Sequence, residues 1–163
     1  MPADAVDRIL AQWRSERPDL DPSPMGIVGR VARASALLGR EVEGVLAEHG
    51  LTGGTFDVLA ALRRAGPPHR LTPTDLYTGL MLSSGSMTAR LDRLEEAGLI
   101  ERLPDPTDRR GVLVGLTPTG FATVDRAVEA HLANEERLLA ALGPRRRDEL
   151  ARLLRHLLLA LGD

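Results

Sequence analysis

Apolar residues recur every three or four positions over most of this chain, which is the spacing of one face of an amphipathic helix. In the first such segment, Val6, Ile9, Leu10 and Trp13 share a face, and a proline-rich linker follows at residues 17–24. Beyond this N-terminal helix, the pattern predicts helices at residues 24–49, 53–65, 73–79, 84–97, 118–142 and 144–161.

The boundaries of these segments carry residue types that start and stop helices. A side-chain hydroxyl at the N-cap accepts a hydrogen bond from a free backbone N–H group of the first turn. Glycine commonly ends a helix because it adopts a positive φ without strain. The expected N-caps are Ser23, Thr52, Thr72, Ser83 and Thr117, and the expected glycine stops include Gly50 and Gly98.

One stretch departs from the helical pattern. After a short predicted strand at residues 99–103, the segment RLPDPTDRRGVLVGLT passes from turn-forming and charged residues to a strict alternation of apolar ones. Alternation with a period of two is typical of a strand. We therefore expect a β-hairpin whose tip carries Asp108, Arg109 and Arg110.

The order of these elements is a short helix, a tight turn, a second helix and a two-stranded ribbon, which is the plan of a winged helix-turn-helix. The expected fold is therefore mainly α with a small β-hairpin wing. We assign residues 1–163 to one domain, with the winged helix-turn-helix at about 52–117 and helical regions at about 4–49 and 118–161.

The second helix of such a unit enters the DNA major groove, so its first turns should be small and polar. Here Met87, Leu91 and Leu94 are expected to face inward. The expected contacts to DNA are Ser83, Ser84, Gly85, Ser86, Thr88 and Arg90. The alternative interpretation is an ordinary N-cap followed by a slack first turn.

The hairpin tip adds arginine, which the negative potential of a minor groove attracts. We expect Arg109 and Arg110 to contact DNA and Asp108 to fix an arginine in place. A solvated loop is the alternative. Residues 83–110 hold five arginines against six acidic residues, so binding must come from geometry, with the acids on the back of the helix.

Composition narrows the remaining possibilities. The 163 residues have a net charge of −2, which argues against non-specific affinity for polyanions, and there is no cysteine for disulfide or thiol chemistry. The start of the chain lacks the apolar core of a signal peptide, so we expect a cytoplasmic protein. The four histidines have no metal-binding spacing and no nucleophile–base pair is visible, so we expect no metal, no cofactor and no enzyme activity.

The segment LSSGSMTARLDRLEEAGLIERLPDPTDRRGVLVGLTPTG resembles the core signature of the MarR family of bacterial transcription regulators. The resemblance implies an obligate homodimer, built from the N- and C-terminal helices, that binds a pseudo-palindromic operator. We expect it to act as a repressor. The apolar faces of the terminal helices are wider than one small domain could cover. A second subunit that buries them would explain this width.

The N-terminal helix, FDVLAALRRAGPP and MTARLDRLE are also similar to the urate-responsive (UrtR/PecS-type) branch of that family. This resemblance implies a ligand site formed by Trp13, Asp57, Arg90 and Arg102, with urate, xanthine or a similar small molecule as effector. Ala89 departs from the asparagine common in the branch.

For each of these residues a structural role is the alternative. Trp13 could pack a dimer interface, Asp57 and Arg90 could form a static ion pair, and Arg102 could contact phosphate. Two other functions also stay open at this point: a helical sensor or interaction module that does not bind DNA, and a regulator of this family that responds to a phenolic compound.

Overall fold

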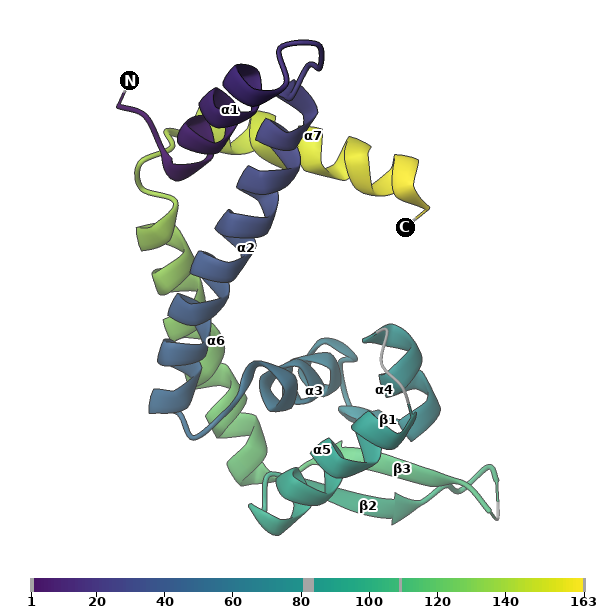
Figure 1. Cartoon of the computed structure of the whole chain (residues 1–163). Helices are drawn as coiled ribbons and strands as arrows, with labels where there is room; N and C mark the ends of the chain where they lie inside the picture. Colours follow the sequence, from purple (N-terminus) through teal and green to yellow (C-terminus); the bar gives the residue numbers. More distant parts are fainter. Residues whose placement is uncertain (1, 81–83, 109, 163) are drawn as a thin grey trace. The chain divides into compact units, whose positions relative to one another are not determined.

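The structure, a computed structural model, describes residues 2–80, 84–108 and 110–162. The chain divides into two compact units, Met1–Glu41 and Val42–Asp163. In the described residues it is mostly helical with one small sheet, so the expected fold class is confirmed (Figure 1).

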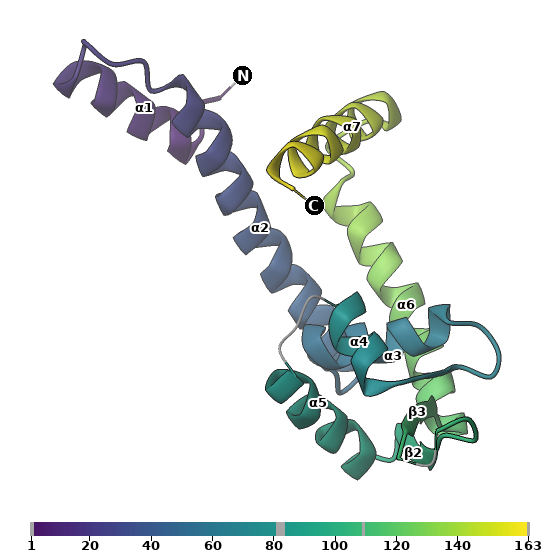
Figure 2. The same ribbon diagram turned by 90° about the vertical axis from the view of Figure 1, so that its right-hand side faces the viewer.

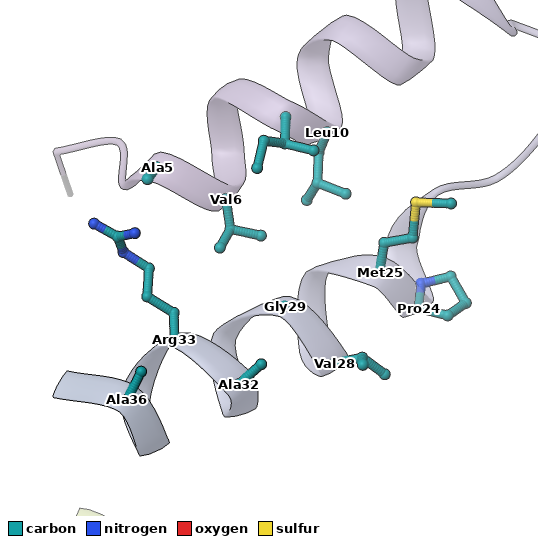
Figure 3. Close-up of a pocket in the computed structure, with 11 residues that line it drawn as sticks. Ala5, Val6, Leu10, Pro24, Met25, Val28, Gly29, Ala32, Arg33 and Ala36 are labelled. Atoms are coloured by element: carbon teal, nitrogen blue, oxygen red, sulfur yellow. The ribbon is translucent and has the colours of Figure 1, made fainter. Parts of the chain in front are cut away.

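The first unit is a helical hairpin. Helix α1 (Ala5–Glu16) packs on the N-terminal part of α2 (Ser23–Glu48), and its Val6 and Leu10 are 6% exposed. The contact is close because Gly29 of α2 lies opposite Val6, whose nearer methyl group would be 3.5 Å from an added Cβ (Figure 3).

Ion pairs close the end of the same hairpin. Asp4 caps α1 in a capping box with Asp7, and Arg30 of α2 binds both carboxylates at 2.8 and 2.6 Å. All three side chains keep much of their solvent contact, so these ion pairs orient the two helices more than they stabilise them.

The second unit begins with the last turns of α2 and contains the sheet. Its further elements are α3 (Gly53–Arg64), β1 (Arg70–Leu71), α4 (Pro73–Gly79), α5 (Ser84–Glu96), β2 (Ile100–Pro104), β3 (Val112–Leu116), α6 (Pro118–Leu138) and α7 (Pro144–Leu161). The strands are antiparallel in the order β1-β3-β2. Figures 1 and 2 show the β2–β3 hairpin beside α5, which confirms the predicted hairpin.

Strand β1 is absent from the sequence prediction. It is only two residues long, and its Leu71 pairs with Val114 of β3, which also faces Arg102 of β2 across the other edge. A segment this short shows no alternation, so only the neighbouring strand reveals it.

The core of the second unit is built on α3. Val58, Leu59 and Leu62 have no solvent exposure, and α3 contacts α4, α5, α6 and β3. The inward-facing residues expected on α5, Met87, Leu91 and Leu94, are at most 2% exposed, so that prediction is confirmed.

Most predicted helix boundaries are present. Thr52, Thr72 and Thr117 each accept a backbone hydrogen bond at the start of their helices, and Gly50 and Gly98 have φ values of 71° and 66°. Ser23 is the first residue of α2 instead of its cap, and Ser83 lies outside the described residues.

The end of α6 differs from the prediction. The apolar pattern predicts a helix to about Leu142, but the helix ends at Leu138. Beyond that point Ala140 donates to the carbonyl of Arg137 and Leu142 to that of Leu139, so the chain tightens into three-residue turns before the Gly143–Pro144 break.

Helix α7 leaves its apolar residues uncovered. None of its residues is buried, and four of its leucines, Leu153, Leu158, Leu159 and Leu161, are at least half exposed. Within the described part of the chain, no helix combines the length and the apolar character needed to cross a membrane.

The start of α6 touches the start of β2 at a point where only glycine fits. The Thr117 hydroxyl donates to the carbonyl of Gly98 at 2.7 Å and accepts from the Gly120 N–H group. An added Cβ on Gly120 would lie 1.8 Å from the carbonyl oxygen of Leu99, which is far inside contact distance.

We therefore expect Gly120→Ala to lower the free energy of unfolding by about 3 kcal/mol or more, because backbone must move to accept the methyl group. Urea denaturation followed by circular dichroism measures this. Gly79→Ala is the control, since an added Cβ there meets nothing within 4 Å. Equal urea midpoints for the two variants would contradict the close contact between Gly120 and Leu99.

Candidate nucleic-acid interface

The first turns of α5 present small polar side chains to solvent. Ser86 and Thr88 are exposed, while Met87 between them is buried in the core of the second unit. This alternation of exposure follows the helical period, so the outer face of α5 is polar and the inner face apolar. Ser84 and Gly85 belong to the first turn of the helix, and Ser83 lies outside the described residues.

The described residues of the wing tip, 105–108, 110 and 111, are held by local hydrogen bonds. Asp108 Oδ1 accepts from the backbone N–H of Arg110 at 2.9 Å, and the Asp108 carbonyl accepts from Gly111 at the same distance. Asp108 therefore shapes the backbone beside Arg110, and no hydrogen bond between their side chains is present in the described residues. Arg110 is exposed, and Arg109 lies outside the described residues.

At the base of the wing tip, Asp105 closes a second turn. Its carboxylate accepts from the backbone N–H and the hydroxyl of Thr107 at 2.8 and 2.7 Å. These hydrogen bonds lower the pKa of Asp105, with the hydroxyl of Thr107 as the largest cause. The carboxylate of Asp105 therefore stabilises this turn through its two hydrogen bonds with Thr107.

Arg102 joins the wing to α5. From β2, its Nη2 donates to Asp92 Oδ1 at 2.6 Å and its Nη1 donates to Glu95 Oε2. These contacts raise the pKa of Arg102, the hydrogen bond to Asp92 being the largest cause. Two acids of α5 therefore face the β2 strand and are neutralised there. The ligand role of Arg102 stays a prediction. In this structure its guanidinium binds the carboxylates of Asp92 and Glu95.

Arg90 turns from α5 towards the N-terminal end of α3. Its Nη1 donates to the carbonyl oxygen of Gly54 at 3.2 Å. Asp57 lies one turn further along α3, where the positive charge of Arg90 acts on its carboxyl group, although no hydrogen bond or ion pair joins the two within the described residues. The structure thus brings Asp57 and Arg90 close together, as the resemblance implies, without pairing them.

Partial loss of hydration dominates the titration of Asp57, although the residue as a whole is exposed. Desolvation raises the pKa of its carboxyl group above the usual 3.8, and the charge of Arg90 offsets only part of that rise. A carboxylate that is disfavoured by its surroundings is ready to accept a cation or a proton.

Trp13 belongs to the first unit, whereas Asp57, Arg90 and Arg102 belong to the second. Its side chain is 43% exposed on α1 and lines a cavity of about 320 Å³ with Arg17, Leu20 and Met25 among its other walls. An exposed indole beside an apolar hollow can cover the flat face of a ligand or of another protein chain.

Sequence reasoning missed two groups of residues at this interface. Asp92 and Glu95 were counted only in the net charge, and their binding to Arg102 was not predicted. Their spacing of three places them on one side of a helix. Gly53 and Gly54 open α3 directly after its N-cap, where glycine is a poor helix former. Two glycines at such a place signal close approach by other groups, and both have one.

A short helix, a turn, a helix with a polar outer face and a hairpin with an exposed arginine together define a winged helix-turn-helix. The model of the MarR family matches residues 49–111. The chain is also 42% identical over 149 residues to the HTH-type transcriptional regulator PecS of Dickeya dadantii (strain 3937), covering 91% of this chain and 90% of the relative. The chain therefore belongs to the MarR family of transcription regulators.

Solved structures agree with this assignment. A mutant MarR from Escherichia coli complexed with operator DNA is 29% identical, with a TM-score of 0.72 over 90% of this chain and 97% of that one. The transcriptional repressor CouR bound to a 23-mer DNA duplex is 33% identical, with a TM-score of 0.71 over 78% and 88%. PecS and CouR are transcription regulators, a class of protein that acts without enzymatic turnover.

The raised pKa of Asp57 makes a prediction about stability. A carboxyl group whose pKa is higher in the folded state stabilises the fold when protonated and loses that contribution as the pH rises through the folded pKa. We expect Asp57→Asn to be as stable as the parent near about pH 4 and slightly more stable near about pH 7. The effect is small, because Asp57 keeps solvent contact.

Urea midpoints of both proteins between about pH 4 and about pH 7 measure this difference. Asp125→Asn is a control at an acid that Arg63 holds at 2.7 Å, so removing that charge is expected to lower the stability slightly near about pH 7. A stability difference for Asp57→Asn that does not change with pH would contradict the raised pKa of its carboxyl group.

Proposed function

We propose that this protein is a cytoplasmic, ligand-responsive repressor that binds a pseudo-palindromic operator as a homodimer. The observation that carries the proposal is the polar, outward face of α5 beside a wing with an exposed arginine. Two structural relatives with this fold are bound to DNA in their solved structures, which supports the same use of the fold here.

In the proposed complex, the outer face of α5 enters the major groove, which is ~12 Å wide. Hydroxyl groups there contact phosphates or base edges, and the wing arginines reach an adjacent minor groove. The proposed contact residues are Ser83, Ser84, Gly85, Ser86, Thr88, Arg90, Arg109 and Arg110, with Asp108 as the residue that positions the wing.

The homodimer accounts for apolar surface that the chain leaves uncovered. In the first unit, a groove of about 770 Å³ is lined by apolar residues of α1 and α2, among them Leu10, Met25 and Val28 (Figure 3). In the second unit, α7 is exposed along its length. We assign dimerisation to residues of about 4–49 and 118–161 and DNA reading to about 52–117 within one domain.

Two reading lobes related by a two-fold axis would meet major grooves about 34 Å apart on one side of the duplex. Each lobe then raises the effective concentration of the other at its half-site. This is the physical reason for a palindromic operator.

The wing makes a testable contribution to affinity. We expect Arg110→Ala to weaken operator binding several-fold and to reduce the slope of log affinity against log salt by about one, because one cation that displaces counterions from the duplex is lost. Fluorescence anisotropy with the duplex that flanks the gene, at several salt concentrations, measures both quantities.

Arg126→Ala is the matched control, since Arg126 is an exposed arginine of α6 and its loss changes the net charge equally. Equal affinities for the two variants would remove the wing from the mechanism. Absence of binding by the parent at low salt would favour the alternative of a sensor module that does not read DNA.

For the effector, we propose an anionic purine such as urate or xanthine at Trp13, Asp57, Arg90 and Arg102. The ligand must bind the released conformation more tightly than the DNA-bound one, and a coupling of ~1–3 kcal/mol gives a roughly 5- to 150-fold loss of operator affinity. The support is the exposed face of Trp13, the proximity of Asp57 and Arg90, and the similarity to PecS.

The two carboxylates on Arg102 sharpen the test. An anionic ligand at Arg102 must compete with Asp92 and Glu95, so we expect Glu95→Gln to bind urate more tightly and Arg102→Ala to bind it more weakly than the parent. Quenching of Trp13 fluorescence and release of labelled operator are followed in the same titration.

The control is Glu96→Gln, which removes a neighbouring charge of α5 that forms no ion pair with Arg102 in the described residues. If the Glu95 and Arg102 variants titrate like the parent, Arg102 is not a ligand residue. Operator release by phenolic compounds but not by purines would replace the purine effector with a phenolic one.

A further inference from the structure

The first two residues of α3 are in close contact with charged side chains from two other helices. The Gly53 N–H donates to both carboxylate oxygens of Glu43, at 3.0 and 3.1 Å, and Glu43 belongs to the last turns of α2. At the next residue, the carbonyl of Gly54 accepts from Arg90 of α5. The start of α3 is thus the place where α2 and α5 both attach through side chains.

The space above Gly54 is filled by the guanidinium of Arg90. An added Cβ on Gly54 would lie 2.6 Å from Arg90 Cζ and 2.8 Å from Nη1. Real Cβ atoms do not approach other atoms this closely, so Arg90 can occupy its position only because residue 54 has no side chain.

This position keeps Arg90 from pairing with nearby carboxylates. Asp57 follows Gly54 by three residues on α3, and Glu43 is held by the neighbouring Gly53 N–H. With the carbonyl of Gly54 as its partner, Arg90 attaches α5 to the backbone of α3 and not to an acidic side chain.

We propose that Gly54 is a positioning residue for the recognition helix: by leaving room for the guanidinium of Arg90 against the α3 backbone, it sets how α5 presents its polar face to DNA. The inference rests on the proposed DNA-binding function. It assigns a role to a glycine that touches neither operator nor effector in the proposed function.

The decisive substitution is Gly54→Ala. The atoms in the way are the far end of a flexible side chain, so Arg90 can move while α3 keeps its place, and alanine is the better helix former. We therefore expect the thermal stability of the dimer to stay the same or to rise. Operator affinity is expected to fall by about tenfold, the effect of losing one charge-assisted hydrogen bond that orders α5.

A double-mutant cycle separates this role from a general effect on α3. The operator affinity of the parent, Gly54→Ala, Arg90→Ala and the double variant is measured with the same labelled duplex. If Gly54 acts through Arg90, the alanine at residue 54 has little further effect once Arg90 is removed. An equal loss, of about tenfold, in both backgrounds overturns the proposal, as does unchanged affinity of the single Gly54→Ala variant.

Two control variants replace a different glycine by alanine. Gly44→Ala adds a methyl group where nothing in the same subunit lies within 4 Å, so this variant, once shown to remain dimeric, reports helix propensity alone. Gly53→Ala displaces the carboxylate of Glu43 and leaves Arg90 in place, so it tests whether any disturbance of the α3 start has the same effect. Losses by either control that match Gly54→Ala overturn the proposal.

A measurement without DNA keeps the inference separate from the proposed function. The Nε–H resonance of Arg90, assigned by its absence from Arg90→Ala, is expected to shift in Gly54→Ala and to stay unchanged in Gly44→Ala. If the parent binds no operator, the proposed function fails while this signal still reports the contact. An unchanged resonance in Gly54→Ala overturns the contact itself.

Discussion

The burial of one face of α3 is the constraint on which the second unit depends. This helix contributes Val58, Leu59 and Leu62 to the centre of the core and contacts α4, α5, α6 and β3. Since apolar burial is non-directional, it holds these elements together without fixing their exact orientation. Directional contacts at the edges of the core supply the rest: Thr117 ties α6 to Gly98, and Arg90 ties α5 to the start of α3.

The near-neutral charge of the reading unit has a structural explanation. Two of the acids on α5 face β2, where Arg102 neutralises them, and two more acids, Asp105 and Asp108, are used in the turns of the wing tip. The polar outer face of α5 is therefore not dominated by carboxylates, although the sum of charges is slightly negative. For a groove-binding surface, the arrangement of charges matters more than their total.

The candidate site could be predicted only where a single residue type implies its role. Exposed hydroxyls on the first turns of α5 and arginine on a hairpin tip follow from residue chemistry and local spacing. The partners of Arg102 and Arg90 could not be foreseen, because a guanidinium has several acids and carbonyls within reach and the choice depends on how β2, α3 and α5 pack. The same reason hid the close approach of Arg90 to Gly54, since a glycine gives no sign of which group will fill its space.

By itself the sequence determined the class of fold, the hairpin, the inward face of α5 and the N-caps at Thr52, Thr72 and Thr117. These features depend on interactions within a few residues, so a local pattern is sufficient to specify them. Only the tertiary structure decided the edge strand β1, the early end of α6 and the close approach of Gly120 to Leu99. The edge strand and the approach of Gly120 depend on contacts between segments far apart in the chain, and the end of α6 depends on a change in backbone hydrogen bonding. Apolar periodicity encodes neither.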